Sequence, residues 1–238
     1  MSAGKQDVQA MRLVLTCEHA FPEIPEDYRY LFRHDLQVLR THEAYDLGSF
    51  DLFKALEPLA DFSHFQNISR LLVECNRSVR SKNLFSRYSA ELGSSDKSRI
   101  LDNYYWPYRE IVEKNIHSLI EDGQEVIHVS VHSFTPVLHG MVRNADIGLL
   151  YDPRRLKEKE IANFWKELLA INSDFKLRSN YPYLGKADGF TTSLRKLFPE
   201  NYSGIEIEVN QKWVNEEKMN NILKSSIFNA LQELKNKA

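Results

Sequence analysis

The sequence has only two cysteines, Cys17 and Cys75, among its 238 residues. Both close apolar runs, where a free cysteine behaves as a small buried hydrophobe. So few cysteines argue against a disulfide-stabilised scaffold and favour a reducing, cytoplasmic location. Residues 1–10, MSAGKQDVQA, lack the basic and apolar regions of a signal peptide, which favours the same location.

Long apolar runs and a surplus of one charge are also missing. No stretch reaches the ~18 apolar residues of a membrane-spanning helix, so no membrane partner is expected. Lysine and arginine together number 31 against 33 acidic residues, for a formal net charge of -2. This balance gives no general attraction to nucleic acid. The positive partners of an acidic ligand must therefore be local.

The composition is that of a globular α/β protein, with 42% hydrophobic and 27% charged residues. The length suits one domain, and no internal repeat, low-complexity tract or linker divides the chain. We therefore expect a single domain over residues 1–238, with its folded core at about 11–235.

Apolar runs typical of strands alternate with stretches of helical periodicity. The expected strands are Met11–Cys17, Ser69–Cys75, Glu125–Val131, Asp146–Tyr151 and Gly204–Val209. The expected helices cover about Thr41–Glu57, Ser98–Glu121, Lys157–Asn172 and Glu216–Lys235. This alternation predicts an α/β fold with a mostly parallel, mixed sheet flanked by helices.

Polar groups follow three of these strands directly: Glu18-His19, Asn76-Arg77 and His132-Ser133. Parallel strands place their carboxyl ends on one edge of a sheet, where ligands bind, so we expect the three groups to converge. Two imidazoles and a carboxylate suit a catalytic zinc site, which has three N or O ligands and an open position. Taken singly, either histidine fits a structural role equally well, but their joint placement favours a metal site.

Two acidic residues are candidates for the third metal ligand. Asp46 lies near the start of the first predicted helix, four residues from His42, so that both would share a helical face. Glu18 adjoins His19, although adjacent side chains of a strand point apart. His42 is either a ligand or a partner of one. Such a ligand set accepts several divalent ions, of which zinc is the one we favour.

The last predicted strand alternates apolar and acidic residues and places Glu206 and Glu208 on one face. Either carboxylate would serve as a general base that deprotonates the attacking water and then protonates the leaving amine. Guanidinium groups bind carboxylates through two hydrogen bonds, which makes Arg70, Arg77 and Arg143 candidates for holding an acidic substrate.

Other chemistries have less support. Ser133 follows His132, but no G-x-S-x-G nucleophile motif surrounds it. Cys17 closes a core run, so packing is favoured over a nucleophilic role. His128 lies inside a predicted strand and is interpreted as a hydrogen-bonded core histidine. The aromatic stretch Tyr104–Tyr108 lacks the basic groove of a nucleic-acid stacking surface.

Several segments, taken in order, resemble the motifs of the N-formylglutamate amidohydrolase family. They are LTCEHAFPEIPEDY, THEAYDLGSFDL, SRLLVECNRS, VSVHSFTPVLHG with RNADIGLLYD, NYPYLGKADGFTT and GIEIEVNQKWV. Together they cover the chain from about Leu13 to Val214. The ordered set is specific, especially CNRS followed by HSFTP and R-x-x-DIG-x-LYD.

The resemblance implies a fold similar to the zinc-dependent exopeptidases and metal-assisted hydrolysis of an N-formyl or N-acyl acidic amino acid. It implies that His19 and His132 are metal ligands, that Asp46 completes the set, and that Glu208 rather than Glu206 is the retained acid. It implies that Arg77, Arg143 and Asn180 are substrate-binding positions. Arg70, Asn76 and Ser133 are further candidates for this role from the residues themselves.

The substrate is less defined than the reaction. This chain has EHA where the best-known deformylase branch of the family has a P-H-S-G-like motif. A zinc peptidase or amidase acting on a short peptide or a cell-wall amide would use the same residues. A third possibility, from another class, is a non-catalytic protein that binds a small acidic ligand.

Overall fold

A six-stranded sheet of order β2-β1-β3-β8-β6-β7 forms the centre of the fold. The computed structural model describes residues 11–171 and 174–237, so the expectations for residues 1–10 and for the helix end at Asn172 fall outside it. Strands β2, β1, β3 and β8 run parallel, β6 pairs antiparallel with β8, and β7 is parallel to β6. The sheet is therefore mostly parallel and mixed, as predicted. In sheet order, the strands are Phe62–Phe65, Met11–Cys17, Glu125–Phe134, Tyr202–Asn210, Ile147–Leu150 and Leu177–Ser179.

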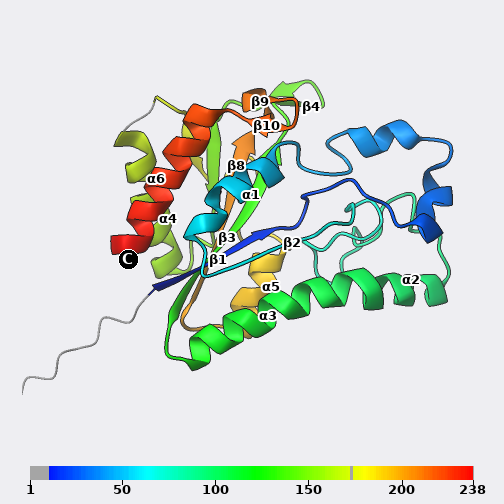
Figure 1. Ribbon diagram of the computed structural model, residues 1–238, viewed down its shortest axis with the longest axis horizontal. Coiled ribbons are helices and arrows are strands. Elements are labelled where there is room, and N and C mark those ends of the chain that lie inside the picture. The colour runs from blue at the N-terminus through cyan, green and yellow to red at the C-terminus, as the bar shows by residue number, and fades with distance from the viewer. Residues whose placement is uncertain (1–10, 172–173, 238) are drawn as a thin grey trace, which may run out of the picture.

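Helices cover both faces of this sheet (Figure 1). One face packs against α1 (Ser49–Leu56), α4 (Leu156–Ile171) and α6 (Asn221–Lys237). The other packs against α3 (Trp106–Glu121) and α5 (Phe190–Leu197). Helix α2 (Ser94–Ile100) continues into α3 through a π-helical turn. Among the described residues, no helix is both long and apolar enough to cross a membrane.

Shorter elements complete the fold. Two small hairpins, β4–β5 and β9–β10, lie beside the upper end of the sheet in Figure 1. Their strands are Val137–Leu138, Met141–Val142, Val214–Asn215 and Lys218–Met219. Single-turn and two-turn 3₁₀ helices cover Glu26–Phe32, Leu36–Arg40, Glu57–Leu59 and Gln211–Trp213.

The alternation of residues along β3 and β8 divides the sheet into an apolar and a polar face. Ile127, Val129 and Val131 belong to the core beneath α1, α4 and α6, as do the alternate residues Ile205 and Ile207 of β8. The intervening residues carry polar side chains on the opposite face, because successive residues of a strand point to opposite sides.

The register of the sheet brings these polar residues together in two pairs. It sets Ser130 beside Glu206 and His132 beside Glu208. Polar side chains of β3 and β8 therefore line one face of the sheet as far as the carboxyl ends of these strands.

Two elements predicted before α2 differ from the structure: the helix expected at about residues 41–57 is present only in its second half, and the strand expected at 69–75 is absent. Residues 41–48 form turns, and the helix begins only at Ser49, so Asp46 and His42 do not share a helical face. The apolar segment Ser69–Cys75 is irregular rather than a strand. Its backbone bonds go to distant carbonyls, with Ser69 N donating to Glu23 O and Glu74 N to Leu84 O. The segment is apolar because it is buried beside α3.

The remaining elements agree more closely with the sequence. The long helix predicted at Ser98–Glu121 and the strands at Met11, Glu125, Asp146 and Gly204 are all present. The final helix begins at Asn221 rather than Glu216, since residues 214–219 form the β9–β10 hairpin. Strand β2 and helix α5 were not expected.

Candidate active site

A cavity of about 490 Å³ opens at the carboxyl ends of β1, β3 and β8. Its walls come from the loops after β1 and β3, the irregular segment around Asn76, and the loop between β7 and α5. Most of the predicted site residues line it: His19, Asp46, Arg70, Asn76, Arg77, His132, Ser133, Arg143, Glu206 and Glu208. The expected convergence of three polar groups is therefore present, although Asn76 and Arg77 reach it from an irregular segment.

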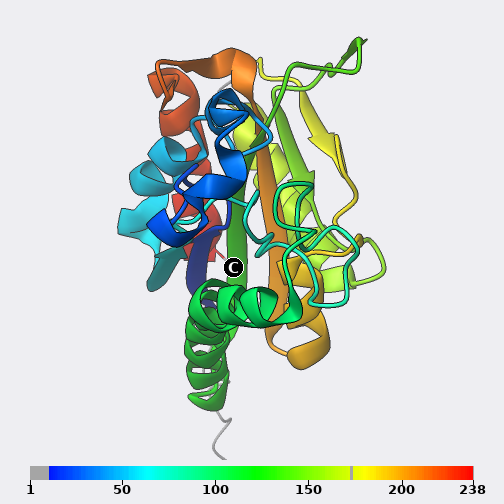
Figure 2. The same cartoon turned by 90° about the vertical axis from the view of Figure 1, so that its right-hand side faces the viewer.

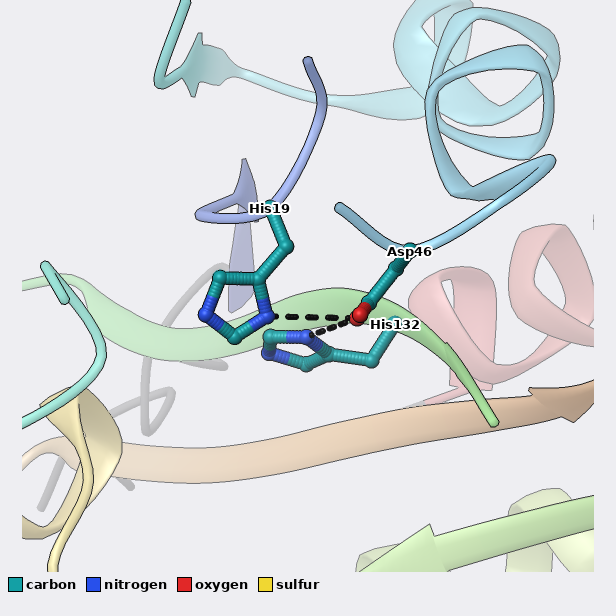
Figure 3. A group of neighbouring side chains, drawn as sticks. All are labelled: His19, Asp46 and His132. Atoms are coloured by element: carbon teal, nitrogen blue, oxygen red, sulfur yellow. Dashed lines mark hydrogen bonds and ion pairs between the residues drawn. The ribbon is translucent and has the colours of Figure 1, made fainter. Parts of the chain in front are cut away.

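His19, Asp46 and His132 form a buried corner of this cavity (Figure 3). The Nδ1 atoms of His19 and His132 lie 3.2 and 2.9 Å from the same carboxylate oxygen, Asp46 Oδ2. The three residues come from the end of β1, the turn before α1 and the end of β3. Within residues 11–171 and 174–237, no other group of three such side chains brings its ligand atoms within 4.8 Å of one another.

The opposite ring nitrogens of both histidines contact carboxylates. His19 Nε2 lies 2.6 Å from Glu74 Oε1, and His132 Nε2 lies 3.2 Å from Glu18 Oε2. The hydroxyl of Ser130 donates to Glu18 and lies 2.8 Å from His132 Nε2. Each ring is therefore held at Nε2 and presents Nδ1 to Asp46.

Glu18 does not line the cavity but lies behind His132. Tyr108 OH donates to its Oε1 at 2.9 Å, and the side chain is almost fully buried. The structure thus places Glu18 outside the His–Asp–His corner that it was predicted to join as an alternative third ligand. The turn after β1 explains this arrangement, because it sends the side chains of Glu18 and His19 in different directions.

The charges in this corner are strongly coupled. Burial lowers the pKa of His132, but the carboxylates of Asp46 and Glu18 outweigh it and hold that pKa well above its usual value. Burial raises the pKa of Glu74, but His19 and Arg70 bring it down to about 2. The corner therefore combines two imidazoles with the carboxylate of Asp46, whose pKa, in spite of burial, is held well below its usual value by His19 and Arg70. This donor set is typical of a divalent metal site.

Arg70 supplies a positive charge at the mouth of the corner. Its Nη1 donates to His19 Nδ1 at 2.9 Å and to Asp46 Oδ1 at 3.1 Å. The rest of the guanidinium is held by the carbonyl oxygens of Glu43 and His42. His42 lines the cavity, but here its backbone rather than its ring makes the contact. Arg70 therefore neutralises Asp46 directly.

The two candidate bases differ in their surroundings. Glu206 Oε1 accepts a hydrogen bond from Thr191 Oγ1 at 2.6 Å. Glu208 is buried, and its Oε2 has no hydrogen-bond partner among the described residues. Burial raises the pKa of Glu208 to about 8, an effect that the nearby imidazole of His132 only partly opposes. An unpartnered carboxylate in a cavity is suited to proton transfer.

Asn76 and Arg77 line the cavity from the irregular segment that follows β2. Asn76 Nδ2 lies 3.4 Å from His132 Nε2, and its Oδ1 accepts from the backbone N–H of Phe190 at 2.7 Å. Arg77 Nη1 donates to the carbonyl of Asn76. Across the described part of the chain, no acidic side chain forms an ion pair with Arg77. Its charge is therefore free to bind an anion.

Arg143 and Ser133 line the same cavity, whereas Asn180 does not. The guanidinium carbon of Arg143 lies 5.1 Å from the centre of the Tyr183 ring. Ser133 Oγ donates to Leu47 O, which gives it a structural contact. Asn180 Oδ1 accepts from the backbone N–H groups of Tyr151 and Gly185. Asn180 thus shapes the loop that borders the cavity, and its predicted contact with substrate stays a prediction.

Glu74 is the residue that the sequence did not reveal. It lines the cavity and contacts His19. In the sequence, however, it lies two residues before Asn76, in an apolar run that is typical of a core strand. Its one sequence signal was a single acid within the run LLVEC. A charged residue in such a run is buried only with a partner, and that partner is His19.

Comparison with known proteins defines the class: the chain is an amidohydrolase, an enzyme that hydrolyses amide C–N bonds of small molecules. It belongs to the N-formylglutamate amidohydrolase family, whose model matches residues 11–214. This confirms the family to which the sequence motifs pointed. A search of curated protein sequences found no match.

Two solved structures share the fold. A gene product of Agrobacterium tumefaciens is 28% identical, with a TM-score of 0.79 over 95% of this chain and 89% of that one. An N-formylglutamate amidohydrolase from Ralstonia eutropha JMP134 is 15% identical, with a TM-score of 0.71 over 97% of this chain and 94% of that one. The α/β architecture is therefore shared along nearly the whole chain.

Proposed function

We propose that this protein is a divalent-metal-dependent amidohydrolase, with zinc as the ion, that cleaves the amide of an N-acylated acidic amino acid. The observation that carries the proposal is the buried corner in which two imidazole Nδ1 atoms face one oxygen of Asp46. Glu208, whose Oε2 is unpartnered in the described structure, lines the same cavity.

The donor atoms suit a metal ion in their chemistry and spacing. Ligands ~2.0–2.1 Å from a tetrahedral zinc ion lie roughly 3.3 Å from one another. Asp46 Oδ2 is 3.2 Å from His19 Nδ1 and 2.9 Å from His132 Nδ1, close to that spacing. His19, Asp46 and His132 would hold the ion, which would supply a Lewis acid that polarises the scissile carbonyl and acidifies water.

The protein's own groups handle the proton. Glu208 would accept a proton from the attacking water at its free carboxylate oxygen and deliver it to the nitrogen of the leaving amine. Arg70, held beside Asp46 by a backbone carbonyl, would donate to the carbonyl oxygen of the substrate as negative charge develops there. Glu206, already bonded to Thr191, would contribute its charge rather than a proton.

We propose an acidic substrate because the cavity contains positive charges that could bind it. Arg77 and Arg143 both line it, and neither forms an ion pair with a described acidic residue. A guanidinium group binds a carboxylate through two parallel hydrogen bonds. A substrate with carboxylate groups would therefore give both guanidinium groups an ion-pair partner, which no acidic residue in the described part of the protein supplies.

The test is hydrolysis by protein freed of metal and then reloaded with one equivalent of zinc. N-acylglutamates, N-acyl-leucines and short peptides should be compared at matched concentrations. We expect hydrolysis only after reloading and a preference for the acidic substrates. Equal rates for leucine and glutamate derivatives would refute the substrate class, while a preference for peptides would favour a peptidase of the same chemistry.

A further inference from the structure

Part of the catalytic cavity, here called its apolar half, is lined by apolar side chains that the hydrolysis of a formyl group does not need. The volume of the whole cavity, about 490 Å³, is in the range of pockets that enclose drug-sized ligands. Besides the charged residues, Phe134, Leu138, Leu184 and Ala187 line it. A formyl group adds only one carbon to the amino acid and leaves this half unfilled.

One wall of the apolar half is the β4–β5 hairpin. The hairpin leaves β3 two residues after His132 and returns to the site at Arg143, and it projects beyond the sheet at the top of Figure 2. Leu138 lines the cavity, while Met141 and Val142 of the same hairpin are 72% and 75% exposed. Exposed apolar side chains that adjoin a pocket are typical of a binding surface.

The other wall is the loop between β7 and α5. Tyr183 and Leu184 line the cavity and remain 47% and 54% exposed. Arg143 lies between the walls, with its guanidinium carbon 5.9 Å from the Phe134 ring and 5.1 Å from the Tyr183 ring. Apolar groups from two segments thus face one entrance.

Both walls are fixed at their bases. Asn210 Nδ2 donates to the carbonyl oxygens of Arg143 and Ala145 and so anchors the hairpin. Gly148 allows the loop to cross the sheet, because a Cβ atom there would lie 1.9 Å from the carbonyl oxygen of Tyr181. The apolar half is therefore a preformed part of the cavity.

We infer that the acyl group of the substrate is apolar and larger than formyl or acetyl, and that it packs between Leu138 and Leu184. This inference rests on the proposed hydrolysis and specifies the acyl group, which the proposed function leaves open. The apolar half lies within the catalytic cavity itself, so its occupant is the part of the substrate beyond the scissile amide. Arg77, which comes from neither wall, holds the acidic half of the substrate.

The test is a series of N-formyl-, N-acetyl-, N-butanoyl- and N-hexanoyl-L-glutamate with zinc-loaded protein. Each buried methylene contributes up to about 0.8 kcal/mol, or about fourfold, so kcat/KM should rise at least tenfold from formyl to hexanoyl. Leu184→Asn and Leu138→Asn should each bring the hexanoyl-to-formyl ratio toward one. Leu156→Asn alters a leucine at the start of α4 that is 69% exposed and does not line the cavity, and it should keep the wild-type ratio.

Binding of the same series to zinc-loaded Glu208→Gln protein, measured by calorimetry, separates the two proposals. A hexanoyl compound that binds at least tenfold tighter than the formyl compound supports the apolar subsite even if no compound is hydrolysed by the wild type. A lack of hydrolysis by the wild type would refute the proposed reaction but not the apolar subsite. If the formyl compound is hydrolysed and hexanoylglutamate neither binds tighter nor reacts faster, the apolar subsite is refuted and the hydrolase stands.

Discussion

His19 and His132 turn the same ring atom, Nδ1, toward a single oxygen of Asp46, at 3.2 and 2.9 Å. Their ring centres lie 4.9 Å apart, and their other nitrogens contact Glu74 and Glu18. Two carboxylates therefore fix the orientation of both rings in advance. The ring orientations are thus preset, so an ion that displaces the Arg70 hydrogen bond from His19 Nδ1 would cost little conformational entropy on binding.

Removing the carboxylate of Glu74 should weaken metal binding. Glu74→Ala deprives His19 Nε2 of its acceptor, and loss of such a contact typically reduces metal affinity ~10–100-fold. Competition with a chromogenic chelator measures the dissociation constant. Glu74→Gln keeps an acceptor oxygen, so its metal affinity should lie between those of Glu74→Ala and the wild type. Glu91→Ala, at an exposed glutamate, should have the metal affinity of the wild type. Equal affinities for all four proteins would show that Glu74 does not position His19.

Substitutions of Glu208 and of Glu206 should lower kcat to very different extents. Glu208→Gln removes the unpartnered carboxylate and should lower kcat ~10²–10⁴-fold with little change in substrate affinity. Glu206→Gln keeps an oxygen for the Thr191 hydroxyl and should lower kcat less than about tenfold. Steady-state kinetics on zinc-loaded proteins would measure both. If the order were reversed, Glu206 would be the base.

Arg77 should matter for acidic substrates in particular. Arg77→Ala removes a charge-assisted hydrogen bond of about 1.5–3 kcal/mol, so kcat/KM for an acylglutamate should fall about 10–100-fold. Arg77→Lys should recover only part of this loss, since an ammonium cannot bind a carboxylate bidentately. Arg80→Ala, at an exposed position three residues later, is the control. An unchanged kcat/KM in Arg77→Ala would exclude its contact with the substrate.

His128 should make the fold sensitive to acid. Thr16 and Tyr202 contact its two ring nitrogens at 2.7 Å each, and burial lowers its pKa from 6.5 to about 4. Between these values the unfolded chain binds a proton that the folded protein excludes. Stability is therefore lost as the pH falls from about 6.5 toward 4, by up to about 1.4 kcal/mol per pH unit.

Urea unfolding of His128→Gln and the wild type at several pH values measures this contribution. The free-energy difference between the two proteins should shrink as the pH falls through this window, because only the wild type carries the imidazole. His34→Gln, at an exposed histidine, should keep the wild-type pH dependence. A constant difference between wild type and His128→Gln from pH 7 to 4.5 would contradict the assignment.

The sequence was informative where strands have regular alternation. β1 and β3 are apolar runs that end in Glu18-His19 and in the polar residues around His132, so their meeting at one sheet edge could be predicted. Alternation along β8 also placed Glu206 and Glu208 on one face. These features depend on the two-residue period of a strand, which a sequence displays directly.

Irregular segments were harder to interpret because burial alone makes a segment apolar. Residues 69–75 are buried beside α3 without strand pairing, and so Glu74 appeared to be part of a core strand. Asp46 does lie beside His19 and His132, but it was chosen from a helical spacing that does not exist. Its position is set by the turn before α1, where its backbone N–H donates to His19 O.

The central claim is that His19, Asp46 and His132 hold a divalent metal ion required for amide hydrolysis. The most direct measurement is zinc content together with hydrolysis of an acylglutamate, for wild type and His132→Ala, after chelation and zinc reloading. We predict about one equivalent of zinc and restored activity in the wild type, and neither in a folded His132→Ala protein. Full hydrolysis by metal-free wild type, or zinc binding and activity that survive loss of His132, would contradict it.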